Sequence, residues 1–404
     1  MRPLAMMLVA FCSCGARTGL EGPETPADGG VDQSSDALGD EVAPDARVAH
    51  LQVAIDVASI CFLRDGHIRC WGQNSGGGVG DGTFVDRYSP VPVLGLPWTE
   101  EVVADDGHFC ARLDDGTARC WGNNSGGRLG IGYVSESGAD AGTESVSVPT
   151  SVVSLTNLVS LSDHMASVSC AGLTNGKYAC WGVTGFGALP GVPQPSQHPV
   201  PIEIPEFAGA TSVTMGADFT CALINGEVEC SGRNEFGELG DGTIVERHTL
   251  APADGVKNAI QISCGDGAAY TLLADHTVLW WGVRVGSNGQ VAEQRLRPTP
   301  LGLSNVLQVA TAGLHVCVRL TDGSVQCAGL NDHGQLGDGT LQSRNTMAPV
   351  IGLSDVVDIV TNYFNSCAIV KTGALYCWGG NQFGQMANGS SGPPQTTPYL
   401  IGGL

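Results

Sequence analysis

The stretch WGQNSGGGVGDGT at residues 71–83 is repeated along the chain, most closely as SGRNEFGELGDGT at 231–243 and AGLNDHGQLGDGT at 328–340. The position of its first residue is filled seven times, by Trp71, Trp121, Trp181, Ser231, Trp281, Ala328 and Trp378. Successive positions are 50, 60, 50, 50, 47 and 50 residues apart. A repeat of this length is typical of a β-propeller or a solenoid, so residues 48–404 are expected to form one domain of seven units.

Glycine and proline are abundant in the 404-residue chain, with 58 and 21 copies, whereas charged residues make up 15% and aromatic residues 6%. This composition, without a sustained helical period, favours short strands joined by tight turns, and the expected fold class is all-β. The net charge of −21 would repel a phosphate backbone, and no cluster of Lys or Arg offsets it. Nucleic acid is therefore not expected as a partner.

The cysteines are spaced for disulfides inside single repeats. Twelve of them form six pairs, nine or ten residues apart: Cys61–Cys70, Cys110–Cys120, Cys170–Cys180, Cys221–Cys230, Cys317–Cys327 and Cys367–Cys377. The nine-residue pairs are centred on Asp65-Gly66 and Asn225-Gly226, dipeptides preferred in two-residue hairpin turns. The ten-residue pairs are centred on three-residue loops that end in glycine. Counting outward from either turn places the two cysteines opposite each other at a non-hydrogen-bonded pair, where side chains approach most closely.

Repeat five supports this assignment, because Tyr270 and Trp280 occupy both cysteine positions and an aromatic cross-strand pair can replace the contact. The alternative is that the cysteines are small buried residues. Metal binding is disfavoured, since each hairpin offers only two sulfurs and no nearby His in a four-ligand arrangement. Six disulfides would place the domain in an oxidising compartment. Cys264 stands outside the pairs and is expected to be a buried small residue.

The amino terminus is typical of an export signal. Met1-Arg2 is followed by an apolar run from Leu4 to Phe11, too short to span a bilayer, and then by Cys12-Ser13-Cys14-Gly15. Residues 1–14 resemble a bacterial lipoprotein signal with Cys14 as the lipidated residue, and plain secretion is the alternative. Residues 15–47 carry eight acids among Gly, Pro and Ser and are expected to be a disordered linker.

The glycine-rich stretches, with further copies WGNNSGGRLGIG at 121–132 and WGGNQFGQMANG at 378–389 and segments such as PVPVLGL at 90–96, resemble the regulator of chromosome condensation repeat family. The resemblance covers nearly all of residues 48–404 and implies a seven-bladed β-propeller of four-stranded blades. Residues 398–404 repeat the segment that elsewhere begins a unit and that the first unit lacks. Pairing of the N- and C-terminal segments is therefore expected to close the ring.

Candidate ligand-binding residues have structural explanations. The Gly-Asp-Gly-Thr runs at 80–83, 240–243 and 337–340 lack EF-hand spacing and a Walker lysine, so they are expected to be turns and not calcium or phosphate sites. His108 and His315 resemble the family's internal hydrogen-bonding histidine. Since no catalytic motif appears, no catalytic residue, metal ligand or cofactor is predicted. Repeat two carries an insertion at 133–148, an acidic loop that could meet a partner or stand alone.

These features predict an exported binding module, lipid-anchored or secreted, that recognises a protein or cell-envelope ligand through its propeller loops. It is expected to be a monomer and not an enzyme. The family resemblance adds two alternatives, an inhibitor of an extracytoplasmic enzyme and a regulator of guanine-nucleotide exchange. Two or three close carboxylates at the mouth of the central channel would instead favour a hydrolytic enzyme.

Overall fold

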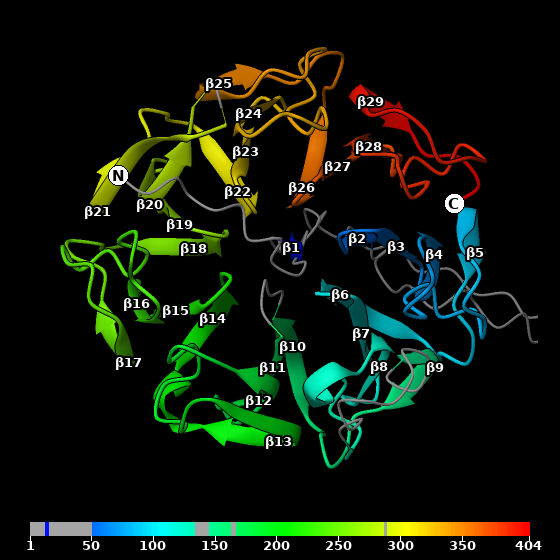
Figure 1. Cartoon of the computed structure of the whole chain (residues 1–404), viewed down its shortest axis with the longest axis horizontal. Coiled ribbons are helices and arrows are strands. Elements are labelled where there is room, and N and C mark those ends of the chain that lie inside the picture. The colour runs from blue at the N-terminus through cyan, green and yellow to red at the C-terminus, as the bar shows by residue number, and fades with distance from the viewer. Residues whose placement is uncertain (1–12, 16–50, 134–144, 163–166, 287–288) are drawn as a thin grey trace, which may run out of the picture.

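A computed structural model describes residues 13–15, 51–133, 145–162, 167–286 and 289–404. From residue 51 onward, these residues form seven antiparallel sheets of four consecutive strands, arranged as blades around a central channel (Figure 1). The short apolar runs become strands because each can pair along its length while its side chains pack against the neighbouring blades. The predicted all-β, seven-bladed propeller is confirmed.

Each blade takes its four strands from one continuous stretch of chain. Blade one contains β2 (Leu51–Ile55), β3 (Ser59–Arg64), β4 (His67–Gly72) and β5 (Arg87–Pro92). Blade two contains β6 (Thr99–Asp105), β7 (His108–Leu113), β8 (Ala118–Asn123) and β9 (Ser145–Ser151). Blade three contains β10 (Leu158–Ser162), β11 (Val168–Leu173), β12 (Tyr178–Thr184) and β13 (Ser196–Ile204). Blade four contains β14 (Ala210–Met215), β15 (Phe219–Ile224), β16 (Glu227–Gly232) and β17 (Arg247–Pro252).

The remaining blades follow the same order. Blade five contains β18 (Ala259–Cys264), β19 (Ala268–Leu273), β20 (Val278–Val285) and β21 (Val291–Pro300). Blade six contains β22 (Val306–Ala312), β23 (His315–Leu320), β24 (Val325–Gly329) and β25 (Arg344–Pro349). Blade seven contains β26 (Val356–Asn362), β27 (Asn365–Val370), β28 (Leu375–Gly379) and β29 (Gln395–Leu400). Among the described residues, two 3-10 helices lie between strands, η1 (Ser125–Gly127) and η2 (Pro205–Phe207).

The hydrophobic core is divided among the junctions between blades. Leu63 and Val79 of blade one, for example, pack with Val102 and Trp121 of blade two in one buried cluster. The outer strands carry prolines, as Pro90 and Pro92 do in β5. Because proline cannot donate a backbone hydrogen bond, these residues protect the outer edge of each sheet from further pairing.

The closure of the ring differs from the prediction in one respect. Residues 398–400 do form a strand, but β29 pairs with β28 of its own blade and not with the first unit. The repeated segment ends a blade and does not begin one, so blade one is complete without it. The segment still joins the ends of the ring, because the next residue, Ile401, packs in a cluster with Val53 and Phe62 of blade one.

The amino-terminal predictions fall mostly outside the described residues. Of the signal peptide (1–14) and the linker (15–47), the structure describes only residues 13–15, which form β1 (Ser13–Gly15). This strand lies in the central channel and pairs antiparallel with β26 (Figure 1). The greater part of the predicted insertion, residues 134–144, also lies outside the described part. Within the described ranges, no helix is both long and apolar enough to cross a membrane.

Candidate binding face

All six predicted cysteine pairs are disulfides in the structure. The paired cysteines lie opposite each other in the register of their hairpins, with 4.1 Å between Cα atoms in every pair. Tyr270 and Trp280 face each other at the same position of blade five, their rings stacked with centroids 6.3 Å apart. Cys264 is fully buried in the cluster that contains Phe219 and Trp281.

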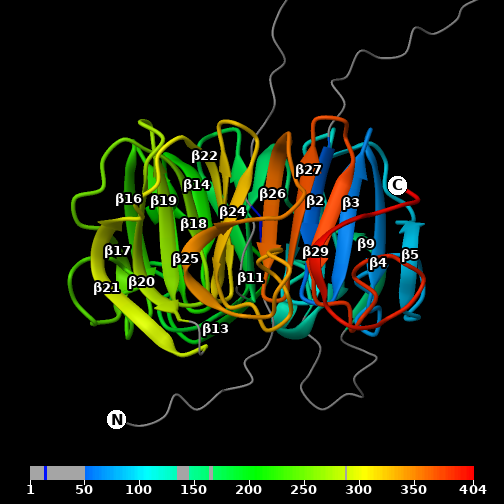
Figure 2. The same cartoon turned by 90° about the horizontal axis from the view of Figure 1, so that it is seen from above.

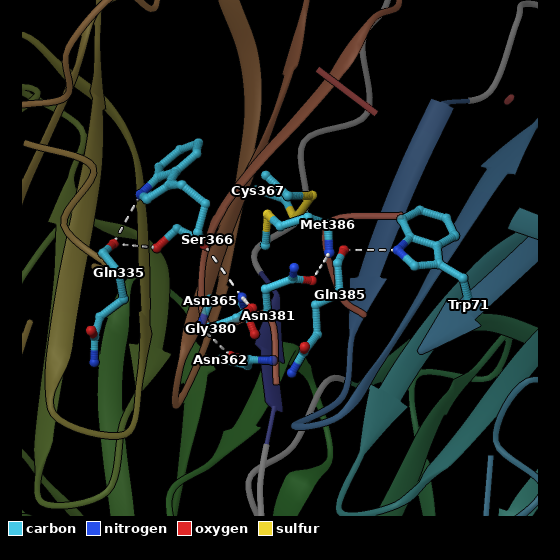
Figure 3. Close-up of a disulfide and its surroundings, with 12 residues drawn as sticks. Trp71, Gln335, Asn362, Asn365, Ser366, Cys367, Gly380, Asn381, Gln385 and Met386 are labelled. Atoms are coloured by element: carbon cyan, nitrogen blue, oxygen red, sulfur yellow. Dashed lines mark hydrogen bonds between the residues drawn. A yellow bond between two sulfur atoms is a disulfide. The ribbon is translucent and has the colours of Figure 1, made fainter. Parts of the chain in front are cut away.

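Tryptophan indoles connect neighbouring blades. Five of them donate from Nε1 to a carbonyl oxygen in the glycine-rich loop of the preceding blade, at 2.7–2.9 Å: Trp71 to Gln385, Trp121 to Gly78, Trp181 to Arg128, Trp281 to Glu238 and Trp378 to Gln335. Figure 3 shows the bond between Trp71 and Gln385. In blade four, where Ser231 replaces the tryptophan, the Thr220 hydroxyl donates to the Ala188 carbonyl at 2.5 Å. The glycine-rich loops are thus fixed by the blade that follows them.

An asparagine inside the glycine-rich loop fixes the loop internally. Asn74 Oδ1 accepts from the Val79 amide at 3.0 Å, and its Nδ2 donates to the Thr83 carbonyl at 3.0 Å. Asn234 and Asn331 make the same two contacts in blades four and six. A buried amide that satisfies both donor and acceptor capacity in this way rigidifies a turn.

The Gly-Asp-Gly-Thr runs are turns, as predicted. Asp81 Oδ1 accepts from both the amide and the hydroxyl of Thr83, and its Oδ2 pairs with Arg87 Nε at 2.6 Å. Asp241 with Arg247 and Asp338 with Arg344 repeat this ion pair at 2.6 Å. The carboxylates are therefore occupied by local donors. Across the described residues, no three His, Cys, Asp or Glu side chains are grouped in a way that could hold a metal ion.

The two predicted histidines bond internally across blade junctions. His108 Nε2 lies 2.8 Å from Ser169 Oγ, and His315 Nε2 lies 3.0 Å from Ser366 Oγ. Ser366 in turn donates to the Gln335 carbonyl, the same oxygen that a tryptophan indole of blade seven contacts (Figure 3). Burial lowers the pKa of His315 to about 3, so the ring is neutral at physiological pH and acts as a structural connector.

The turns of the blades separate into two faces. Because the four strands of a blade alternate in direction, the turns after the first and third strands lie at one end of the ring, which we call the loop face. The turns after the second strand lie at the opposite end, the hairpin face. Figure 2 shows the ring from the side, with these two faces above and below the sheets. All glycine-rich loops belong to the loop face.

The turns after the first strands, which we call the inner turns, lie on the loop face around the channel, and several of them carry carboxylates. Burial, with the nearby charge of Asp106 as a smaller contribution, raises the pKa of Asp56 to about 7, although the Gly107 amide donates to it at 3.0 Å. Burial also raises the pKa values of Asp106, Asp218 and Asp266. Asp106 is paired with Arg128 at 2.9 Å. These acids hold loops through specific donors, and together they give the inner turns an acidic character.

Aromatic rings accompany the acids on the same face. Phe186, in the blade-three loop, is 53% exposed. In blades six and seven the ring centroids of His333 and Phe364 are 4.6 Å apart, and Tyr363 lies beside Phe364 with centroids 6.0 Å apart. Tyr363 also hydrogen-bonds to the side chain of Asp266, which lowers the pKa of that carboxyl against the larger effect of burial. Rigid aromatic rings beside carboxylates are suited to binding a partner surface.

The acids of the loop face were not predicted from the sequence. The sequence does contain a pattern that could have revealed them. In four repeats an acid stands three to five residues before the first cysteine of the hairpin, or before its replacement Tyr270: Asp56, Asp106, Asp218 and Asp266. The acids are spread over more than 200 residues of sequence, and only the ring brings them to one face.

Glu238 is a buried carboxylate on the loop face, and the effect of its burial on stability can be measured. Its carboxylate accepts from the Phe236 amide at 2.8 Å, and burial raises its pKa from 4.5 to about 7. Gln335 and Gln385 occupy the same position in blades six and seven and accept from the matching amides at 2.9 Å. An amide therefore fits this position.

We expect Glu238→Gln to be nearly neutral at pH 4.5 and stabilising by about 2 kcal/mol at pH 8. The folded wild type binds the Glu238 proton more tightly than the unfolded chain does, so it loses stability as pH rises from 4.5 through about 7. The variant lacks this titration. Urea unfolding of both proteins at the two pH values measures the difference, and an equal difference at both would contradict the buried titration.

The comparisons with known proteins agree with this architecture. Residues 102–128 and 356–385 match the model of the Regulator of chromosome condensation (RCC1) repeat. An RCC1 repeat-containing protein of Dictyostelium discoideum is 26% identical over 177 residues, which are 39% of this chain and 36% of that protein. The Regulator of chromosome condensation of Homo sapiens is 28% identical over 149 residues, or 35% of each chain. The matches thus span about a third of the length of these relatives.

A solved structure shares the whole ring. The structure of Prp20p from Saccharomyces cerevisiae superposes with a TM-score of 0.71 over 84% of this chain and 86% of that chain, at 19% identity. At this identity the likeness shows the fold alone. Two repeats of this chain are therefore similar to RCC1 repeats, and its seven-bladed ring is similar in fold to that of Prp20p.

Proposed function

We propose that this protein is an extracytoplasmic binding module that holds a protein or cell-envelope ligand on its loop face. The observation that carries the proposal is the set of aromatic rings on that face, together with the half-buried carboxylates of Asp218 and Asp266, on a face whose glycine-rich loops are fixed by indole–carbonyl and asparagine bonds. Pre-organised loops lose little conformational entropy on binding. The six disulfides are consistent with an oxidising compartment. We infer a monomer, and one without catalytic activity because the two neighbouring acids at the channel, Asp56 and Asp106, are buried and held by the Gly107 amide and by Arg128.

The proposal includes attachment through a lipidated Cys14, with plain secretion as the alternative. Attachment requires that β1, in which Cys14 pairs with Thr361 of β26, leave the channel. A Cys14→Ala form is expected to leave the membrane fraction and appear as soluble extracytoplasmic protein, because two or more acyl chains are what hold a lipoprotein at a bilayer. Fractionation of wild-type and variant cells measures this. Membrane partition that does not change in the variant would contradict the anchor.

Binding can be tested with the soluble Cys14→Ala form, immobilised and exposed to envelope proteins and wall fragments of its own cell. Phe186→Ala and Glu235→Ala alter exposed side chains of the loop face, and Lys371→Ala alters an exposed side chain of the hairpin face. We expect each loop-face variant to weaken binding about tenfold and Lys371→Ala to leave it unchanged. The absence of any retained ligand, or a loss of binding only with Lys371→Ala, would contradict the proposal.

Two alternatives differ from this function in the partner that they require. Inhibition of an extracytoplasmic enzyme is a special case of the binding module and predicts that the retained ligand is an enzyme whose activity falls when it binds. A regulator of guanine-nucleotide exchange would need a cytoplasmic or nuclear GTPase. Prp20p of Saccharomyces cerevisiae, which shares the ring, binds Gsp1p and histones. Six disulfides and a net charge of −21 make this alternative the weaker one for the present chain.

A further inference from the structure

One junction of the ring differs from the other six. Blade one comes first in the chain and blade seven last, so no polypeptide connection runs from blade seven to blade one. Side chains and backbone bonds alone hold this seam: Asn362 Nδ2 donates to the Asp56 carbonyl at 2.6 Å, and Arg64 Nη2 donates to the Gly373 carbonyl at 2.5 Å.

A groove opens on the hairpin face at the seam. Its volume is about 420 Å³. Its lining includes Phe62, Arg64, Asp65, His67, Arg69 and Leu404, and we call it the seam groove. In the groove, the Arg64 guanidinium lies over the Phe62 ring, 5.3 Å from its centroid. His67 and Arg69 are exposed along its edge.

The seam groove contains two arginines and a histidine beside one acid, Asp65. Most arginines and lysines of the described residues have a carboxylate partner, as Arg87, Arg112, Arg247 and Arg344 do. Arg64 and Arg69 have no carboxylate within ion-pair distance among the residues that the structure describes. Arg64 is already engaged by the carbonyl oxygens of Gly373 and Leu404. His67 and Arg69 are therefore the groups that can meet an acidic occupant.

The chain itself brings acids to this place. Leu51, the first residue of β2, pairs with Arg64, so the polypeptide enters blade one beside the seam groove. Residues 16–50 lie outside the described part, but their sequence places Asp40, Glu41 and Asp45 within eleven residues of Leu51. A tether this short keeps its charges at an effective concentration on the order of millimolar.

We propose that the seam groove binds residues 38–47 of this chain, with Asp40, Glu41 and Asp45 paired to His67 and Arg69. The contact fixes the point where the linker leaves the ring, on the face opposite the loops. If the chain is anchored through Cys14, as proposed above, the loop face then points away from the membrane. This last consequence rests on the proposed function, whereas the contact itself does not.

Limited proteolysis of the soluble Cys14→Ala form tests the contact without any ligand. Trypsin cleaves after Arg47, at the end of the proposed segment, and after Arg17, which lies far outside it and serves as an internal reference. We expect the additional pair of changes His67→Ala and Arg69→Ala to speed cleavage at Arg47 roughly threefold and to leave cleavage at Arg17 unchanged. Neither change alters the cleaved sequence.

Arg119→Ala is the matched control, because Arg119 precedes Cys120 in blade two as Arg69 precedes Cys70 in blade one. It should leave both cleavage rates unchanged. Equal cleavage at Arg47 in all variants, or the same acceleration by Arg119→Ala, would overturn the proposal. Acceleration of wild-type cleavage by millimolar phosphate beyond that by chloride of equal ionic strength would also overturn it, in favour of a small-anion site.

Discussion

Reduction of the six disulfides is expected to prevent the propeller from holding its fold. Each disulfide closes a loop of nine or ten residues and restricts the unfolded chain. Each should contribute about 2 kcal/mol, and contributions from separate blades add, giving on the order of 10 kcal/mol. This is comparable with the whole stability of an ordinary domain.

The test is to unfold the protein in denaturant, dilute it with or without reductant, and compare circular dichroism and tryptophan fluorescence. Because the cysteines are buried, reductant must be present while the chain is unfolded. The double variant Cys221→Ala/Cys230→Ala is the control for a single blade and should lose only about 2 kcal/mol. A reduced chain that regains native spectra and an unchanged urea midpoint would show that the disulfides are dispensable.

Trp71→Ala is expected to open the ring at its seam. Trp71 is fully buried in the cluster between blades seven and one, and its indole donates to the Gln385 carbonyl at 2.8 Å. Removal of a buried indole should cost about 3–5 kcal/mol. Trp71→Phe should cost less, since it keeps most of the packing and loses mainly the bond to Gln385.

Trp121→Ala is the matched control, because Trp121 makes the same kind of bond at a junction that the chain crosses. We expect similar losses of stability from the two alanine variants but different hydrogen exchange. In Trp71→Ala, the amides of β2 and β26 should exchange faster, since no covalent connection keeps blades seven and one together. If Trp121→Ala produced the same increase at its own junction, the seam would have no special weakness.

The fold and the disulfides could be predicted from the sequence because their determinants are local. A cysteine pair is fixed by the turn between its members, and Asp65-Gly66 or a three-residue loop sets the register by itself. The spacing of Trp71 and its equivalents determined the number of blades in the same way. The replacement of both cysteines by Tyr270 and Trp280 was informative because the two residues face each other across one hairpin.

The binding face and the closure of the ring depend on contacts between distant residues. The repeat shows where one unit resembles the next but not which strand begins a blade, so residues 398–404 were assigned to the wrong end of a unit. Asp56 and Asp266 are 210 residues apart in sequence and belong to one face only because seven blades close a ring. The seam groove, likewise, forms only when Leu404 returns to blade one.

The short span of every disulfide has a consequence for oxidative folding. Partners nine or ten residues apart collide sooner than any cysteines of different blades, because closure of a longer loop carries a larger entropic cost. Correct pairing can therefore follow the order of synthesis, one hairpin after another, before the ring exists. Such a chain can reach its native cross-links with little reshuffling, and its slow step is the docking of finished blades and not thiol exchange.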